Sequence, residues 1–454
     1  MAKTKTKLFL LTGLLSVFLA TSGLSCKLFP TSQAPTSLTK EIELEYWGVW
    51  DDSDYLQPLI NEFESLHPNI SVNYRKFQFA EYEQNLLEAW AEDRGPDIYS
   101  LPASWLKEYK TKITPQPEAV RLAFQQTEQK LGKTETTTFV RNVPIFKPSD
   151  IKNQFVDVVY QDVVIDNQIY GLPYSVDTLA LFYNRDLLDK AGVPTPPSNW
   201  TEVAEAVKKI TQVNQNNEFI QSGIALGTAD NINNSVDIVS MLMMQNGAQM
   251  IKNGNVSFHL SVDGYRPGLE ALNFYSDFAD PIKEVYSWSN DQPNSLDAFM
   301  SGQLAMIITY SYNLPRIKAR APKIDLGIAR LPQIKDTYKT VNYTNYWVET
   351  VAHKTANAEA AWGFLNFASS EDHVSQYLAK AKKPTALRNL IESQITDPEI
   401  GVFASQVLTA TGWYRGQDAL KMEEIMRQLI KDLPNSPQPE KLLETAAAQV
   451  NQTL

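Results

Sequence analysis

Cysteine and histidine are scarce in this sequence. One cysteine, Cys26, occurs in 454 residues, so neither an internal disulfide framework nor a zinc site with several Cys ligands can form. The four histidines include no pair at i, i+4, which excludes the zinc site built on one helix. We therefore predict no metal and no other cofactor.

Long basic runs are also missing. The chain has 41 Lys and Arg against 52 Asp and Glu, which gives a formal net charge of −11. An acidic chain without a Lys/Arg run is poorly suited to binding nucleic acid, so we expect no such partner. Hydrophobic residues make up 43% of the chain, enough for the cores of about two or three domains.

Common enzyme motifs are absent. The chain has no Gly-x-Ser-x-Gly turn, no Gly-x-x-x-x-Gly-Lys phosphate loop and no His-Glu-x-x-His helix. We predict no catalytic residues and no enzymatic activity. The adjacent acids Asp51 and Asp52 leave a carbohydrate-active enzyme as an alternative, because glycosidases use paired carboxylates.

The N-terminus has the pattern of a secretory signal. Three lysines within the first seven residues precede an apolar run, Leu8–Ala20, which is too short for a membrane span of about 20 residues. We predict a signal peptide over residues 1–25 and a Pro/Ser/Thr-rich tether over residues 26–40.

The position of Cys26 resembles the lipobox of bacterial lipoproteins. Ser25 occupies the small-residue position before the cysteine, although the usual leucine is displaced by one residue, to Leu24. The resemblance implies that a lipid on Cys26 holds the protein at the outer face of the cell membrane, or in a periplasm. Ordinary signal cleavage with an unmodified cysteine is the alternative.

The periodicity after residue 40 predicts an α/β protein. Ile42, Leu44 and Tyr46 alternate with glutamates as in a strand, apolar residues between Tyr55 and Leu66 recur at helical spacing, and a second alternating run starts at Ile70. Strand, helix and strand at this spacing form a βαβ unit with parallel strands. We predict a partly helical surface insertion over the polar, Thr-rich residues 110–140. Trp90, Trp200 and Trp362 fall on helix stripes or helix starts and are expected in the core.

Several motifs in order resemble one family. They are Trp47-Gly48-Val49-Trp50 with Pro68-Asn69-Ile70, then Gly95-Pro96-Asp97-Ile98, then Tyr170-Gly171-Leu172-Pro173-Tyr174 with Asp177 and Leu181-Phe182-Tyr183-Asn184, and Phe299-Met300-Ser301-Gly302-Gln303-Leu304-Ala305-Met306. Together they resemble the extracellular solute-binding proteins of bacterial ABC importers, of the sugar-binding type.

The resemblance implies a two-lobed type II periplasmic-binding fold with a hinged cleft between the lobes. On the motif positions, lobe 1 comprises residues 38–175 and 334–384, and lobe 2 comprises residues 176–333 and 385–454. It further implies a monomer that takes a sugar or oligosaccharide as ligand and the permease subunits of an ABC transporter as partners.

The ligand site is expected where aromatic rings are bordered by hydrogen-bonding groups, because sugars present both apolar faces and hydroxyls. On the family's contact positions we predict ligand contacts from Trp47, Trp50, Asp51, Asp52, Trp105, Asp177, Tyr310, Tyr312, Tyr346, Trp347 and Trp413. Ser104 and Glu349 are further candidates, and Asp230 and Asn231 are weaker ones.

Two other functions fit the same residues. A cationic small molecule such as a polyamine also suits acids and aromatic faces. A structural or adhesive surface lipoprotein would bind no ligand saturably.

Overall fold

The computed structural model describes residues 39–130, 133–216, 218–336 and 339–454. The predicted signal peptide, Cys26 and nearly all of the predicted tether lie outside these residues.

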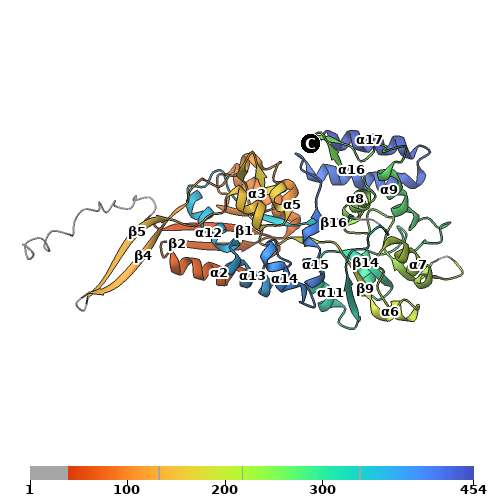
Figure 1. The fold of residues 1–454 in the computed structure, drawn as a ribbon, viewed down its shortest axis with the longest axis horizontal. Helices are drawn as coiled ribbons and strands as arrows, with labels where there is room; N and C mark the ends of the chain where they lie inside the picture. Colours follow the sequence, from red (N-terminus) through yellow and green to blue (C-terminus); the bar gives the residue numbers. More distant parts are fainter. Residues whose placement is uncertain (1–38, 131–132, 217, 337–338) are drawn as a thin grey trace, which may run out of the picture.

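One half of the molecule is built on a four-stranded sheet in the order β17-β3-β1-β2 (Figure 1). Strand β1 (Ile42–Gly48) runs parallel to β2 (Ile70–Lys76) and β3 (Ile98–Pro102), and β17 (Trp347–Val351) pairs antiparallel with β3. Helix α2 (Ser53–Leu66) connects β1 to β2, so the predicted βαβ unit is confirmed.

The period-two pattern of β1 decides which of its side chains enter the core. Leu44 and Tyr46 are buried, whereas Glu43 and Glu45 are exposed. Helix α2 buries an apolar stripe, and α12 packs against α2, α13, β1 and β17. The other helices of this half are α3 (Phe79–Ala91), α4 (Pro148–Gln154), α5 (Asp157–Val163), α12 (Ala358–Ser369) and α13 (Glu371–Ala381).

The other half is built on a five-stranded mixed sheet in the order β10-β11-β14-β9-β15. Its strands are β9 (Ala180–Asn184), β10 (Gln212–Val213), β11 (Phe219–Ile224), β14 (Leu304–Thr309) and β15 (Leu326–Ala329). The surrounding helices are α6 (Arg185–Lys190), α7 (Trp200–Ile210), α8 (Ser235–Gln245), α9 (Pro267–Asp277), α10 (Ser295–Met300), α11 (Leu314–Arg320), α16 (Ala419–Asp432) and α17 (Pro439–Asn451).

A small sheet in the order β18-β16-β8 lies between the two halves. Strand β8 (Asp177–Thr178) leads from the first sheet toward β9, and β16 (Asn342–Asn345) leads from β15 to β17, so the chain crosses between the halves at both strands. Strand β18 (Ala410–Thr411) pairs with β16. Helices α14 (Arg388–Ile395) and α15 (Gly401–Ala404) lie near this junction in Figure 1. The residue boundaries given above for the two lobes stay predictions.

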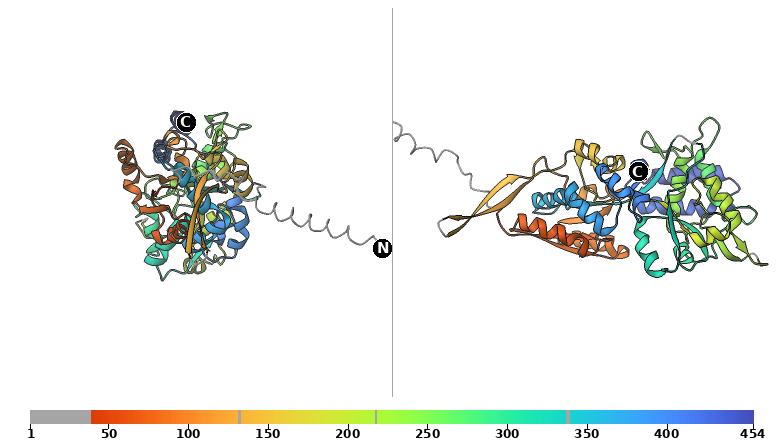
Figure 2. Two further views of the ribbon diagram at one scale, coloured as in Figure 1. Left: turned by 90° about the vertical axis from the view of Figure 1, so that its left-hand side faces the viewer. Right: turned by 60° about the horizontal axis from the view of Figure 1, so that its bottom comes forward.

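The predicted partly helical insertion is a long β-hairpin, apart from one short 3-10 turn. Strands β4 (Arg121–Lys130) and β5 (Lys133–Asn142) pair antiparallel and project from the body in Figures 1 and 2. The helical part of the prediction was wrong because β-branched threonines favour strands and pair well across them. Thr127 lies opposite Thr136, with their hydroxyl oxygens 3.2 Å apart. Two further short strand pairs are β6 (Val164–Ile165) with β7 (Gln168–Ile169), and β12 (Ile251–Lys252) with β13 (Asn255–Val256).

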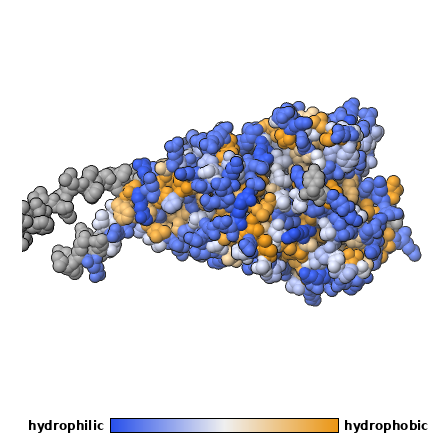
Figure 3. Space-filling view, viewed as in Figure 1, coloured by the Kyte–Doolittle hydropathy of each residue, from blue (hydrophilic) through white to orange (hydrophobic). Residues whose placement is uncertain are grey.

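The predicted core tryptophans are confirmed, since Trp90, Trp200 and Trp362 are all buried. On the face shown in Figure 3, hydrophilic residues cover most of the surface and hydrophobic ones lie between them in small groups. Within the part of the chain that the structure describes, no helix is long and apolar enough to cross a bilayer.

Replacement of a core tryptophan should cost far more stability than replacement of an exposed one. Trp362 is fully buried on α12, and its ring N–H donates to the Thr114 carbonyl over 3.1 Å. We expect Trp362→Ala to lower the free energy of unfolding by about 3–5 kcal/mol, because it leaves a cavity. Trp50 is 42% exposed, so Trp50→Ala should lower it by less than about 1 kcal/mol. Urea unfolding followed by circular dichroism measures both, and equal losses would contradict the assigned burial.

Candidate functional site

A cavity of about 580 Å³ lies between the two halves and takes lining residues from both. The loops after β1 and β3 contribute Trp50 and Trp105, which are at the carboxyl ends of parallel strands, where open α/β sheets bind their ligands. The second half contributes residues of α8, α16 and the 3-10 helix η3 (Ser311–Asn313). We refer to this space as the main cavity.

Many of the predicted site residues line the main cavity. They are Trp50, Asp51, Ser104, Trp105, Asp177, Tyr312, Tyr346, Trp347 and Glu349. These residues come from segments up to about 300 positions apart, brought together by the crossing strands β8 and β16. Their contact with a ligand stays a prediction.

An aromatic stack bridges the two halves across the main cavity. The Trp50 ring stacks on Tyr312 with centroids 5.4 Å apart and planes at 24°, and on Phe79 with centroids 5.9 Å apart. The Trp347 ring packs edge-to-face with Trp50, with the ring centroids 6.1 Å apart. Trp50 and Tyr312 are 42% and 44% exposed, so part of each ring remains free for contact with a ligand. The spacing leaves no room for another ring between them, because van der Waals contact on both faces needs about 7 Å.

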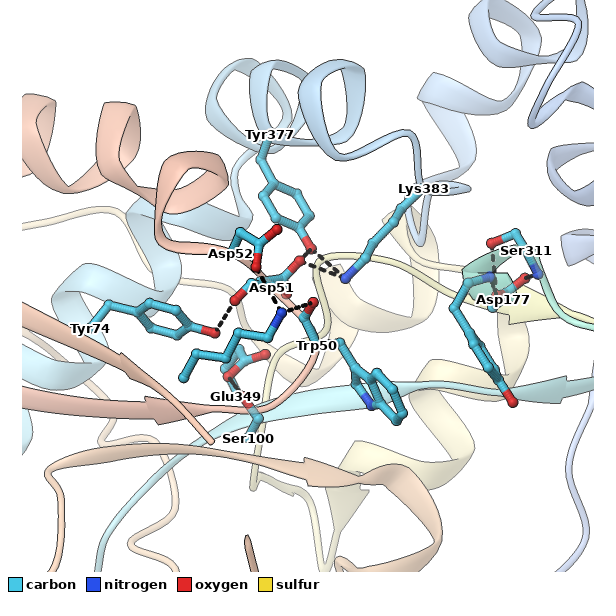
Figure 4. Close-up of polar contacts among 12 residues, drawn as sticks. Trp50, Asp51, Asp52, Tyr74, Ser100, Asp177, Ser311, Glu349, Tyr377 and Lys383 are labelled. Carbon is cyan, nitrogen blue, oxygen red and sulfur yellow. Dashed lines mark hydrogen bonds and ion pairs between the residues drawn. The ribbon is translucent and has the colours of Figure 1, made fainter. Parts of the chain in front are cut away.

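Asp177 joins β8 to the segment that carries Tyr312. Its carboxylate accepts hydrogen bonds from the Ser311 hydroxyl at 2.7 Å, from the Ser311 backbone N–H at 3.2 Å and from the Tyr312 backbone N–H at 3.3 Å (Figure 4). It also accepts one from the backbone N–H of Thr178 at 2.8 Å. Burial raises the pKa of Asp177 to about 6 despite these donors. The carboxylate therefore orients Tyr312 from within the protein.

Asp51 has a corresponding role in the first half. It accepts a hydrogen bond from the Tyr377 hydroxyl at 2.9 Å and forms an ion pair with Lys383 at 2.7 Å (Figure 4). The Tyr74 hydroxyl donates to the Asp51 backbone carbonyl at 2.8 Å. These contacts tie the loop that carries Trp50 to α13 and the segment after it.

Glu349 is a buried acid in the wall of the main cavity. It lies in β17 directly opposite Ser100 of β3, whose hydroxyl donates to Glu349 Oε2 at 2.6 Å. The residue is 5% exposed, and burial raises its pKa to about 7. Glu349 therefore retains its proton to higher pH than an ordinary glutamate.

The second half adds two acids that the sequence did not reveal. Asp237 of α8 accepts a hydrogen bond from the Tyr310 hydroxyl at 2.8 Å, and burial raises its pKa to about 7. Glu423 of α16 accepts no hydrogen bond from any described residue, and burial raises its pKa as well. Arg427 lies one helical turn beyond Glu423 and also lines the main cavity. Neither helix carries a local motif that distinguishes these positions from ordinary surface charges.

Four predicted site residues do not line the main cavity. Trp47 lies on the same face of β1 as the exposed Glu43 and Glu45. Its ring packs on Phe77, with the ring centroids 4.5 Å apart. Asp52 lies at the start of α2 and pairs with Lys76 at 2.7 Å on the surface.

Tyr310 and Trp413 are the other two. Tyr310 is fully buried because the backbone turns into η3 there, so its ring stacks beneath Tyr312 at 5.7 Å. Trp413 is 5% exposed and packs edge-to-face against Phe258 and Tyr414. Trp413 therefore presents no open ring face to the main cavity.

The weaker candidates Asp230 and Asn231 also lie away from the main cavity lining. Asp230 pairs with Lys431 at 2.7 Å. Asn231 donates to the backbone carbonyls of Ser289 and Gln292 and accepts from Thr228. Both residues hold loops of the second half together. Among the described residues, no group of three or more His, Cys, Asp or Glu side chains is placed to hold a metal ion.

Comparison with known proteins agrees with this geometry. Residues 48–374 match the family model of the bacterial extracellular solute-binding proteins. A putative binding protein of Brucella abortus (strain 2308) is 23% identical over 70% of this chain and 69% of its own. The galactooligosaccharide-binding protein of Bacillus subtilis (strain 168) is 21% identical over 86% of this chain and 82% of its own.

A solved structure shows the same fold. The ABC transporter solute-binding protein of Thermotoga lettingae TMO, bound with α-D-tagatose, superposes with a TM-score of 0.67 at 19% identity, over 90% of this chain and 99% of that one. The chain belongs to the bacterial extracellular solute-binding protein family and has its two-lobed type II periplasmic-binding fold. The predicted family and fold class are confirmed.

The buried acid of β17 should make stability depend on pH. Because the pKa of Glu349 is about 7 in the folded chain against 4.5 ordinarily, the folded state binds its proton more tightly between these pH values. Stability from this group is therefore highest below about pH 4.5 and falls as pH rises to about 7. Glu349→Gln cannot ionise and keeps an oxygen that accepts from Ser100. We expect Glu349→Gln to be more stable relative to wild type at pH 8 than at pH 5, so its free energy of unfolding minus that of wild type should be larger at pH 8.

Urea unfolding at pH 5 and pH 8 measures this difference. Glu118→Gln, at an exposed position outside the main cavity lining, is the control and should differ from wild type equally at both pH values. The same equality for Glu349→Gln would contradict the assigned burial effect.

Proposed function

We propose that this protein captures a sugar or oligosaccharide outside the cytoplasm and delivers it to the permease subunits of an ABC transporter. Support comes from the family and from relatives that are named as binding proteins for galactooligosaccharides, maltodextrin and arabinooligosaccharides. The main cavity, at about 580 Å³, falls within the range of about 300–1,000 Å³ that is usual for small-molecule sites.

The observation that carries the proposal is the half-exposed aromatic stack with polar neighbours. The exposed parts of the Trp50 and Tyr312 rings suit the apolar C–H groups of a sugar ring. Carboxylates and amides at the same cavity, including Glu349, Asn345 and Glu423, suit its hydroxyls. We propose that the ligand contacts Trp50, Tyr312 and Trp347, with Asp51, Asp177, Trp105, Tyr346 and Glu349 as further contact or positioning residues.

A ligand held between the halves drives closure through its preference for the closed form. It stabilises that form only by the difference between its affinities for the closed and open states. A shift from 1:99 to 99:1 needs about 5.5 kcal/mol of preference. Ring contacts of about 0.5–1.5 kcal/mol and charge-assisted hydrogen bonds of about 1.5–3 kcal/mol supply this together. We further propose that the protein acts as a monomer and leaves its ligand chemically unchanged.

A cationic ligand such as a polyamine is the second candidate. Asp237, Glu349 and Glu423 are cavity acids without an ion pair to a described residue, and a ligand cation would favour their ionised forms. Lys383, Arg316 and Arg427 at the same cavity offset this attraction, so we favour the neutral sugar.

A thermal-shift screen tests the proposed function. Ligands that bind the folded state raise the melting temperature by mass action. We expect a rise with one or more of maltose, maltotriose, galactobiose, cellobiose and arabinotriose, and none with spermidine or putrescine. A rise with a polyamine alone would establish the second candidate. Chromatography of the incubated sugar checks that it is returned intact.

Loss of one ring of the aromatic stack should weaken sugar binding selectively. We expect Trp50→Ala to reduce affinity for the sugar identified in the screen at least about tenfold, or about 1.4 kcal/mol, because exposed aromatic surface at the main cavity is lost. Calorimetric titration measures it. Tyr265→Ala is the matched control, since Tyr265 is 48% exposed but lies outside the main cavity lining. Equal affinities for Trp50→Ala and the control would remove Trp50 from the site.

We propose that residues 1–25 are removed on export and that a lipid on Cys26 anchors the mature protein. Twelve residues separate Cys26 from Thr39, where the described chain begins, so the anchor lies within about 45 Å of the body at full extension. In cells, Cys26→Ser should move the protein from the membrane fraction to the soluble extracytoplasmic fraction. Ser32→Ala, in the predicted tether, keeps both the cysteine and Ser25 and serves as the control. Unchanged membrane association of Cys26→Ser would contradict lipidation.

A further inference from the structure

A second, smaller cavity of about 50 Å³ adjoins the main cavity. The two share the lining residues Ser104, Asp237, Asn345, Tyr346 and Glu423. Since a water needs about 10–15 Å³ measured in this way, the smaller space holds about three to five waters. We refer to it as the side chamber. Its size suits a substituent of a ligand whose body lies in the main cavity.

One wall of the side chamber contains a buried donor without an acceptor. Trp413 lines the chamber and is 95% buried, and its Nε1–H donates to no described residue. The ring is held by edge-to-face contacts with Phe258 at 6.2 Å and Tyr414 at 5.6 Å. A buried donor left unpaired costs about 1–3 kcal/mol, so an acceptor is expected in the chamber.

The acids of the side chamber differ in what they can still accept. The Asp162 carboxylate accepts hydrogen bonds from Arg415 Nε at 2.6 Å and from the Tyr346 hydroxyl at 2.7 Å. Asp237 accepts from the Tyr310 hydroxyl. Glu423 alone of these acids accepts no hydrogen bond from a described residue, although Arg427 lies close enough to attract it. The side chamber therefore offers one free donor, Trp413 Nε1–H, and one free acceptor, the Glu423 carboxylate.

This pairing selects for a hydroxyl group. A hydroxyl both accepts and donates, so it satisfies Trp413 and Glu423 together. An ammonium group has no lone pair to accept from Trp413, and an anion would be repelled by Glu423 and Asp237. A hydroxymethyl group has two non-hydrogen atoms, which fits a space for about three to five waters.

We propose that the side chamber is a subsite for the exocyclic hydroxymethyl group of a sugar ring held in the main cavity. Trp413 Nε1–H donates to the hydroxyl oxygen, and the hydroxyl donates to the Glu423 carboxylate. The subsite thus distinguishes hexopyranoses from pentopyranoses and from 6-deoxy sugars. The inference rests on the proposed sugar-binding function and adds a specificity that this function does not require.

Trp413→Phe and Glu423→Gln test the subsite. The phenylalanine keeps an aromatic ring but has no N–H, and the glutamine keeps the size of the glutamate without its charge. Glu424→Gln is the matched control, because Glu424 is the next residue of α16, is exposed, and pairs with Lys421 outside both cavities. The probes are maltose, cellobiose, the 6-deoxy forms of both, and xylobiose, titrated by calorimetry against each variant. Melting temperatures of the unliganded variants verify folding.

We expect Trp413→Phe and Glu423→Gln each to weaken maltose or cellobiose binding at least about fivefold, with Glu424→Gln unchanged. The 6-deoxy forms should bind wild type and Trp413→Phe equally, because the lost hydrogen bond requires the hydroxyl. If Trp413→Phe does not fold, the comparison of Glu423→Gln with Glu424→Gln decides the question alone.

Two results would overturn the inference while leaving the proposed function intact. In one, maltose or cellobiose binds wild type, Trp413→Phe and Glu423→Gln equally, which would show that the chamber holds water only. In the other, xylobiose or a 6-deoxy form binds wild type as tightly as its hexose counterpart. If neither these probes nor any other sugar binds wild type, the proposed function fails and the inference fails with it.

Discussion

The hydrogen bonds around the crossing strand β8 determine how the two halves meet. Asp177 in this strand accepts four hydrogen bonds, three of them from the segment Ser311–Tyr312 of the second half. That arrangement fixes Tyr312 against Trp50, which extends from β1 of the first half. Without these hydrogen bonds, Tyr312 would not be held against Trp50, and the main cavity would lose its aromatic surface.

The acids around the main cavity therefore divide into two groups by their partners. Asp51 and Asp177 are satisfied within the protein, and they hold the segments that carry Trp50 and Tyr312. Glu423 accepts no hydrogen bond from a described residue, and it faces both the main cavity and the side chamber. Because a buried polar group without a partner is costly, such groups indicate where a ligand supplies the missing hydrogen bonds. We therefore propose that positioning and recognition are performed by different carboxylates.

The sequence predicted the features that local periodicity or strand ends determine. The βαβ unit and the buried tryptophans follow from patterns within short windows, whereas the cavity-lining residues Trp50 and Asp51 were predicted from the resemblance to the family. Asp237 and Glu423 could not be predicted, because they lie on helices that meet only in the folded chain. Trp413 was expected to offer a ring face, but packing against Phe258 turns that ring into the interior. The hairpin β4–β5 was missed because polar composition outweighed the strand preference of threonine.

The central claim is that the two halves hold a sugar in the main cavity, against the exposed parts of the Trp50 and Tyr312 rings, without changing it. A crystal structure of the protein grown with the sugar identified by the thermal-shift screen tests this claim most directly. The account predicts electron density for an intact sugar in the main cavity, with a ring in contact with Trp50 or Tyr312. Density for the sugar elsewhere on the molecule, or for a cleaved product in the cavity, would contradict it.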